Sequence, residues 1–292
     1  GNGPDDALAA SMAIGVARAD VAWQMAKKQL SVEGDKLAYN VLKAYQEILK
    51  KEQEKEFADL GLKRARKQAE ITNFKYVSGM VSQFEQDQAQ NTLREEIKKA
   101  EAAAKALTDA RQKLNSLLGV SEDKVYELLD KPKLVKLDMD EEGLGVHINR
   151  MTSDSTAAWL ADQNVKLAEM TLNLYVFNDP SNPNPYRAVQ IDLDKARNAA
   201  ADTKKQLADS TRALYYNIKQ LEDQYEILQT NLAKAEDSLK VLRLRYDLGM
   251  ATESELLDAE YQVAQLKNNL YSLAIQHEQL KTAFAMPWVL GA

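Results

Sequence analysis

Apolar residues recur along much of the chain with the spacing of a coiled-coil seam. Between residues 187 and 248, one apolar series returns every seven residues, and a second is interleaved with it at steps of four and three. This spacing is typical of long helices that pack side by side as a left-handed coiled coil. The first series comprises Leu207, Leu214, Leu221, Leu228, Ala235 and Leu242. Because a long amphipathic helix cannot bury its apolar stripe alone, we expect each helix to pack on another.

Helix-breaking residues divide the chain into a few long segments. Gly79 and Gly249 are predicted to lie in tight turns, and three prolines between residues 178 and 185 predict a loop. The pattern predicts helices at about 5–77, 82–118, 152–176, 187–248 and 252–286. The predicted fold is therefore all-α, built from long antiparallel coiled-coil hairpins.

The two turns belong to an internal repeat. A shift of 170 residues, from Gly79 to Gly249, superposes both turns and the flanking helices without a gap. The glycines suit a left-handed helix end, and Ser82 and Thr252 suit N-caps of the returning helices. We predict a first repeat at 5–119, a connector at 120–147, a second repeat at 148–286 and a frayed tail at 287–292 that includes Trp288.

Composition narrows the function classes. The chain has 11 Gly, 6 Pro, no Cys and a net charge of −6, which disfavours an ordinary α/β domain, a disulfide framework and a general nucleic-acid binder. It shows no apolar run long enough for a membrane helix and no signal-peptide pattern, and Gly1 to Pro4 resemble a trimmed end. It also lacks a phosphate loop, a metal-binding motif and a recognisable nucleophile, so we expect no enzyme activity, metal or cofactor.

Single aromatic and histidine residues have mostly structural interpretations. Trp23 and Trp159 are expected to anchor packing, and His147 is expected to be a connector residue. His277 interrupts the apolar series of the last helix. It is interpreted either as a partly exposed or hydrogen-bonded interface residue or as a pH switch.

The second turn resembles a family signature. Residues 245–252, Arg-Tyr-Asp-Leu-Gly-Met-Ala-Thr, followed by Leu-Asp-Ala at 257–259, resemble the pattern of TolC-like outer-membrane efflux proteins. The first turn is similar but looser, with Asp-Gln-Ala at 87–89 and Leu-Leu-Gly at 117–119. The resemblance covers roughly residues 7–119 and 148–286.

The resemblance implies a role in transport. Such proteins form trimers in which the helices of three chains build a hollow barrel in the periplasm. The turns lie at its tip, where the tunnel closes and periplasmic adaptor proteins dock. The implied tip and docking residues are Tyr76, Gly79, Met80, Tyr246, Leu248, Gly249 and Met250. The implied location is the periplasm or the outer membrane, and the implied activity is passive export.

One departure from the family pattern leaves an alternative open. Family members insert a membrane β-hairpin between the first two helices of each repeat. In the second repeat that place is taken by residues 178–185, which are too short and too rich in proline for two membrane strands. In the first repeat, the equivalent place would precede Asp5. A chain that lacks these strands could instead be a structural coiled-coil spacer of the cell envelope.

Overall fold

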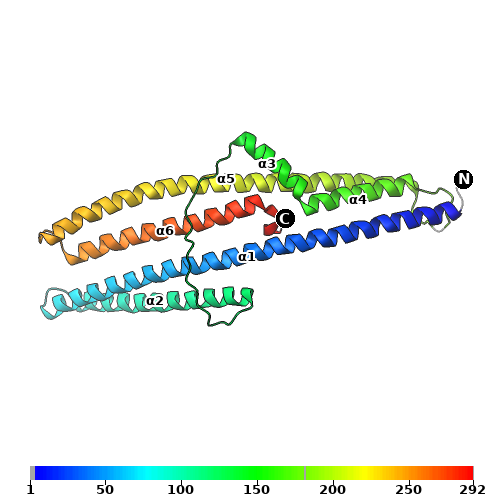
Figure 1. The fold of residues 1–292 in the computed structure, drawn as a ribbon. Helices are drawn as coiled ribbons and strands as arrows, with labels where there is room; N and C mark the ends of the chain where they lie inside the picture. The colour runs from blue at the N-terminus through cyan, green and yellow to red at the C-terminus, as the bar shows by residue number, and fades with distance from the viewer. Residues whose placement is uncertain (1–3, 181, 292) are drawn as a thin grey trace. The chain divides into compact units, whose positions relative to one another are not determined.

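The fold is a set of long helices joined by short turns and two longer connections (Figure 1). The computed structural model describes residues 4–180 and 182–291, so Gly1 to Gly3, Ser181 of the predicted loop and Ala292 of the predicted tail lie outside it. The elements are α1 (Pro4–Val77), α2 (Gln83–Leu118), α3 (Glu141–Asp154), α4 (Thr156–Asn173), α5 (Tyr186–Asp247), α6 (Glu253–Ala285) and the 3-10 helix η1 (Pro287–Leu290). The described residues contain no strand. The all-α prediction is confirmed.

The chain divides into two compact units that both draw on distant parts of the sequence. Unit 1 comprises Gly1–Tyr39, Leu137–Asn217 and Leu280–Ala292, and unit 2 comprises Asn40–Lys136 and Ile218–Gln279. This division into units does not test the predicted repeat boundaries, which remain a prediction.

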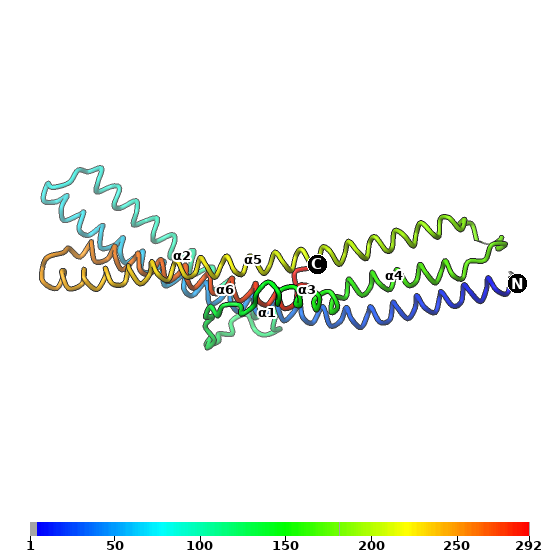
Figure 2. The backbone as a smooth tube through the Cα atoms, turned by 90° about the horizontal axis from the view of Figure 1, so that it is seen from above, coloured from blue at the N-terminus to red at the C-terminus, as the bar shows by residue number. Residues whose placement is uncertain are grey.

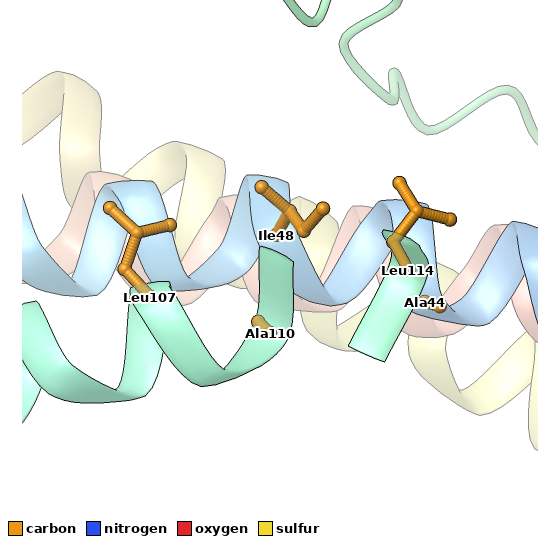
Figure 3. Close-up of a cluster of buried hydrophobic side chains, with 5 residues drawn as sticks. All are labelled: Ala44, Ile48, Leu107, Ala110 and Leu114. Atoms are coloured by element: carbon orange, nitrogen blue, oxygen red, sulfur yellow. The ribbon is translucent and has the colours of Figure 1, made fainter. Parts of the chain in front are cut away.

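Within unit 2, α1 and α2 pack through a core of small and medium side chains. Figure 3 shows Ala44 and Ile48 of α1 beside Leu107, Ala110 and Leu114 of α2, and all five are buried. The alanines allow the two backbones to approach closely. Each fully buried leucine or isoleucine contributes about 1.5–3 kcal/mol. The tight α1–α2 hairpin follows from this alternation of large and small residues.

The side-chain amide of Asn115 holds the chain in place where α2 ends. Gly119 adopts φ 66°, which ends the helix. The Nδ2 atom of the buried Asn115 donates hydrogen bonds of 2.8 Å to the carbonyl oxygens of Glu122 and Lys124. Asn115 therefore holds the start of the connector, which contains no helix between residues 119 and 140.

Unit 1 pairs α4 with the first part of α5. Glu169 accepts from Arg197 at 2.9 Å, and Asp162 accepts from Lys204 at 2.7 Å. Figures 1 and 2 both place α4 beside α5 and the N-terminal part of α1. The α5 residues buried in this unit include Val189, Leu193, Ala200 and Leu207.

A helix forms over the last seven residues of the predicted connector, 141–147. α3 begins at Glu141 rather than near Thr152, because the Asp140 side chain caps it by accepting from Gly143 N–H at 2.8 Å. Ser155 ends α3 and caps α4. His147 is accordingly a helical residue. Its Nε2 lies 2.8 Å from the carbonyl oxygen of Phe284, and the two rings stack with centroids 4.0 Å apart.

Two expectations about tryptophans were wrong. Trp288 is not frayed, because its indole N–H donates to Asp35 at 2.8 Å and the neighbouring Pro287 and Val289 are buried. Trp23 does not anchor packing, because its side chain is 61% exposed. Trp159 lies within unit 1, with the Lys28 ammonium 5.0 Å from its ring.

Candidate functional site: the two hairpin tips

The first tip is a left-handed helix end centred on a glycine. Gly79 has φ 72° and donates its N–H to the carbonyl oxygen of Tyr76 at 2.9 Å. Met80 N–H donates to the carbonyl oxygen of Lys75 at 2.8 Å. This pair of bonds is the Schellman motif, which satisfies carbonyl groups that a helix end would leave unpaired.

The second tip repeats this geometry 170 residues later. Gly249 has φ 71° and donates to Tyr246 at 2.9 Å, while Met250 donates to Arg245 at 2.7 Å. The predicted left-handed glycines are confirmed at both positions. Equal sequence spacing is therefore matched by equal backbone geometry.

Matching capping boxes begin the two returning helices. Glu85 Oε2 accepts from Ser82 N–H at 2.8 Å, and Glu255 Oε2 accepts from Thr252 N–H at 2.7 Å. In return, the Ser82 and Thr252 hydroxyls accept from the backbone N–H groups of the two glutamates. These hydrogen bonds to the carboxylates lower the pKa of Glu85 and Glu255. The predicted N-caps are confirmed.

The apolar residues predicted at the tips are accessible. Tyr76 and Tyr246 are each 38% exposed, and Met80, Leu248 and Met250 are more exposed. Four further exposed apolar residues close to the turns were missed: Phe74, Val77, Phe84 and Leu244. The sequence places each of them within five residues of a tip glycine, but it does not show that they are exposed.

The tips differ in the side chains that brace them. At the first tip, Tyr76 donates its hydroxyl to Gln83, and Gln86 donates to Asn73 at 3.0 Å across the hairpin. At the second tip, the guanidinium of Arg245 donates to the carbonyl oxygen of Met250 at 3.3 Å. The backbone turns are thus alike while their surfaces are chemically distinct.

Polar contacts join α1 to α6 near the second tip. Arg64 donates to Asp258 at 2.7 Å, and Lys67 lies 3.3 Å from Glu253. Gln68 also donates to Ser254. Arg64 further lies over the ring of Tyr261, with 4.8 Å from its guanidinium carbon to the ring centroid. These contacts link the two hairpins within unit 2.

An open groove of about 530 Å³ lies on unit 2 behind the second tip. Its apolar lining comes from Leu60, Leu239, Val263 and Ala264, and its charged lining comes from Glu236, Lys240, Arg243, Glu260 and Lys267. Ion pairs of 3.1 Å between Arg243 and Glu260 and of 2.9 Å between Lys267 and Glu236 bridge α5 and α6 beside it.

The described part of the chain shows no cluster of three or more histidine, cysteine, aspartate or glutamate side chains that could hold a metal ion. No helix among the same residues is both long enough and apolar enough to cross a membrane.

Comparison with known proteins adds a family match. Residues 143–284 match the profile of the outer membrane efflux protein family. A search of curated proteins finds no match to the chain.

The fold also matches solved outer-membrane proteins. CusC, whose structures concern transmembrane channel formation, superposes with a TM-score of 0.63 and 14% identity over 92% of this chain and 72% of its own. VceC from Vibrio cholerae superposes with a TM-score of 0.61 and 17% identity over 96% and 75% of the two chains. The CmeC channel from Campylobacter jejuni superposes with a TM-score of 0.60 and 13% identity over 91% of this chain and 66% of its own. The chain thus spans roughly two thirds to three quarters of these proteins.

Three observations converge on one assignment. The efflux signature lies at the second tip, the family profile matches residues 143–284, and the helical fold is that of solved outer-membrane channels. They show that residues 143–284 resemble the outer membrane efflux protein family and that the chain has the helical fold of solved outer-membrane channels.

Proposed function

We propose that three copies of this chain enclose an extracytoplasmic α-helical tunnel and that the two hairpin tips dock a periplasmic adaptor protein. In this role the chain is non-catalytic and lies in the periplasm or at the outer membrane. Export through the tunnel is passive, with energy supplied by the inner-membrane partner of the adaptor.

The observation that carries the proposal is the matched geometry of the tips. Gly79 and Gly249 take the same left-handed conformation, and both turns present exposed methionines, Met80 and Met250. Exposed apolar side chains on a rigid turn suit recognition, because the backbone of the turn loses little conformational entropy on binding. Both tips lie at the same end of unit 2 in Figures 1 and 2, where one partner could reach them.

Docking can be tested by cross-linking in cells. A photo-reactive amino acid at Met80 or Met250 is expected to capture a periplasmic adaptor, identified by mass spectrometry. The same amino acid at Lys98, an exposed residue of α2 away from the turn, is the matched control and should not capture it. Equal capture at all three positions, or none at the tips, would contradict docking through the tips.

Assembly is tested separately by light scattering. A tunnel formed by three chains predicts a mass three times the 32.7 kDa of one chain. A stable monomer or dimer at high protein concentration would count against the tunnel, even if the cross-links were found.

A further inference from the structure

The loop between α4 and α5 in unit 1 carries three aromatic side chains that pack on one another. The ring centroid of Phe177 lies 5.1 Å from that of Tyr175 and 5.1 Å from that of Tyr186, and the two tyrosine centroids are 5.2 Å apart. We call these three residues the aromatic cluster. Its most exposed member is Phe177, which is 63% exposed, and Leu174 at the end of α4 is 37% exposed.

The backbone of this loop holds the aromatic cluster in place. The Tyr175 hydroxyl donates to the carbonyl oxygen of Asn184 at 2.8 Å, which joins the two sides of the loop. Asn182 N–H donates to the carbonyl oxygen of Asp179 at 3.2 Å, and the Asn182 side chain accepts from Asn184 N–H at 3.1 Å. The three prolines of the loop further restrict φ. Phe177 is therefore presented on a fixed turn, whose backbone loses little entropy when the ring is covered.

Charged residues are nearly absent from this part of the sequence. Residues 170–186 contain one, Asp179, whereas 28% of the whole chain is charged. Segments of the same length across the two tips, 70–86 and 240–256, contain three and six. The uncharged polar residues of segment 170–186 include four asparagines. Aromatic rings with polar hydroxyls and few charges are typical of segments that lie at the boundary between lipid and water.

The charges at this end of unit 1 indicate which kind of lipid surface fits. Figures 1 and 2 both place the N-terminal end of α1 at the same end of unit 1 as the α4–α5 loop. Asp5 and Asp6 are exposed near the start of α1, and the exposed Arg187 directly follows the loop. Because these residues carry no excess of positive charge, an anionic surface would not attract them. A zwitterionic surface still accepts an inserted apolar side chain.

We propose that the aromatic cluster binds the surface of a zwitterionic phospholipid bilayer, with Phe177 inserted at the boundary between headgroups and acyl chains. The driving force is burial of the exposed ring and of Leu174 rather than charge attraction. The contact rests on the extracytoplasmic location of the proposed function but needs neither the trimer nor docking at the tips. A failed vesicle experiment would therefore leave both of those proposals standing.

The probe is a vesicle of phosphatidylcholine, mixed with the full chain. Because the chain has no cysteine, Asn178→Cys provides a single site for an environment-sensitive fluorophore next to Phe177. Asn149→Cys, at an exposed residue of α3 in the same unit, is the matched control. One inserted loop gives weak, reversible binding, so lipid is titrated to millimolar concentrations. The emission at residue 178 is expected to shift to shorter wavelength as lipid is added, and the emission at residue 149 to stay unchanged.

Vesicle flotation measures the contribution of the aromatic ring. Phe177→Asn is expected to reduce the partition coefficient about tenfold, because burying a phenylalanine side chain is worth at least that factor. Phe177→Leu keeps an apolar side chain and should retain most of the binding. Phe84→Asn changes a phenylalanine of the first tip that is 74% exposed, and it should leave the partition coefficient unchanged. Circular dichroism checks that each variant remains helical.

A tethered format guards against binding that is too weak to detect. A histidine tag ahead of Gly1 holds the chain on phosphatidylcholine vesicles that contain nickel-chelating lipid, which raises the effective concentration of the loop at the surface. No change at residue 178 in either format would overturn the proposal, as would equal changes at residues 178 and 149. Equal losses for Phe177→Asn and Phe177→Leu would refute insertion of an apolar side chain. Binding that requires anionic lipid and disappears at high salt would refute it as well, because charge attraction would then be the driving force.

Discussion

The carboxylate of Glu222 and the imidazole of His277 lie 2.9 Å apart between α5 and α6, and both side chains are almost completely buried. Lys219 lies 3.4 Å from the second carboxylate oxygen of Glu222. The residue that interrupts the apolar series of α6 is therefore a buried, hydrogen-bonded partner of α5. A polar pair in an apolar seam favours one arrangement of the two helices, because any other leaves both groups unpaired.

Breaking this pair on one side should be costly. His277→Leu removes the imidazole from the Glu222 carboxylate, which keeps Lys219 as a neighbour, and we expect a loss of about 1–3 kcal/mol in the free energy of unfolding. The double variant Glu222→Leu with His277→Leu should be markedly less destabilised, because it leaves no buried charge. Urea denaturation of the single and double variants measures both effects. Additive losses would show that the two residues are not coupled.

The tip glycines should tolerate no β-branched residue. Gly79→Ala and Gly249→Ala are expected to cost about 1–2 kcal/mol each, because both positions require positive φ, and valine should cost more. Gly15→Ala is the matched control. It lies within α1 with open space around it, so alanine should stabilise the helix by about 1 kcal/mol. Thermal unfolding measures the change in stability at the three sites. A change of the same sign at all three would contradict this account.

The capping boxes should contribute to acid sensitivity. Because the folded-state pKa of Glu85 and Glu255 is lowered, their contribution to stability is present above the unfolded pKa, about 4.3, and is lost as the pH falls through the lower folded value. Glu85→Gln with Glu255→Gln should therefore flatten the decline in stability over this range. Denaturation curves recorded at successive acidic pH values, with Glu101→Gln as an exposed control, test the change in slope.

Tyr271 should contribute to the loss of stability at alkaline pH. Burial, with Glu52, Tyr45 and Glu56 nearby, raises the pKa of its hydroxyl to about 12. A raised folded pKa means that its contribution to stability is complete below the unfolded value, about 10, and is lost as the pH rises toward 12. Tyr271→Phe should make stability less sensitive to pH in this window. Tyrosinate absorbance should show one fewer late-titrating group, and an unchanged titration would contradict the assignment.

Local signals explain why much of the fold could be predicted. The turns at Gly79 and Gly249 combine a left-handed residue with a capping serine or threonine three positions later, so their geometry follows from neighbouring residues. The apolar heptads define the long helices between them. The tip surface was only partly anticipated, because exposure of Phe74 and Phe84 depends on packing rather than on local sequence.

Non-local contacts account for what was missed. α3 contains two glycines and lacks a heptad seam, and its His147 meets Phe284, which is 137 residues away. The Trp288 contact with Asp35 spans 253 residues. Nothing in the neighbouring sequence indicates either partner, so the connector and the tail were predicted to be more irregular than they are.

The non-helical connector after Asn115 also offers a natural place to split the protein. Cleavage among its exposed residues, near Asp123, would leave one fragment with α1 and α2 and another with α3 to α6, each carrying a complete tip. The fragments would still share the Arg64–Asp258 and Lys67–Glu253 contacts. Co-expressed halves could therefore be used for fragment complementation, in which each tip is altered or labelled independently of the other.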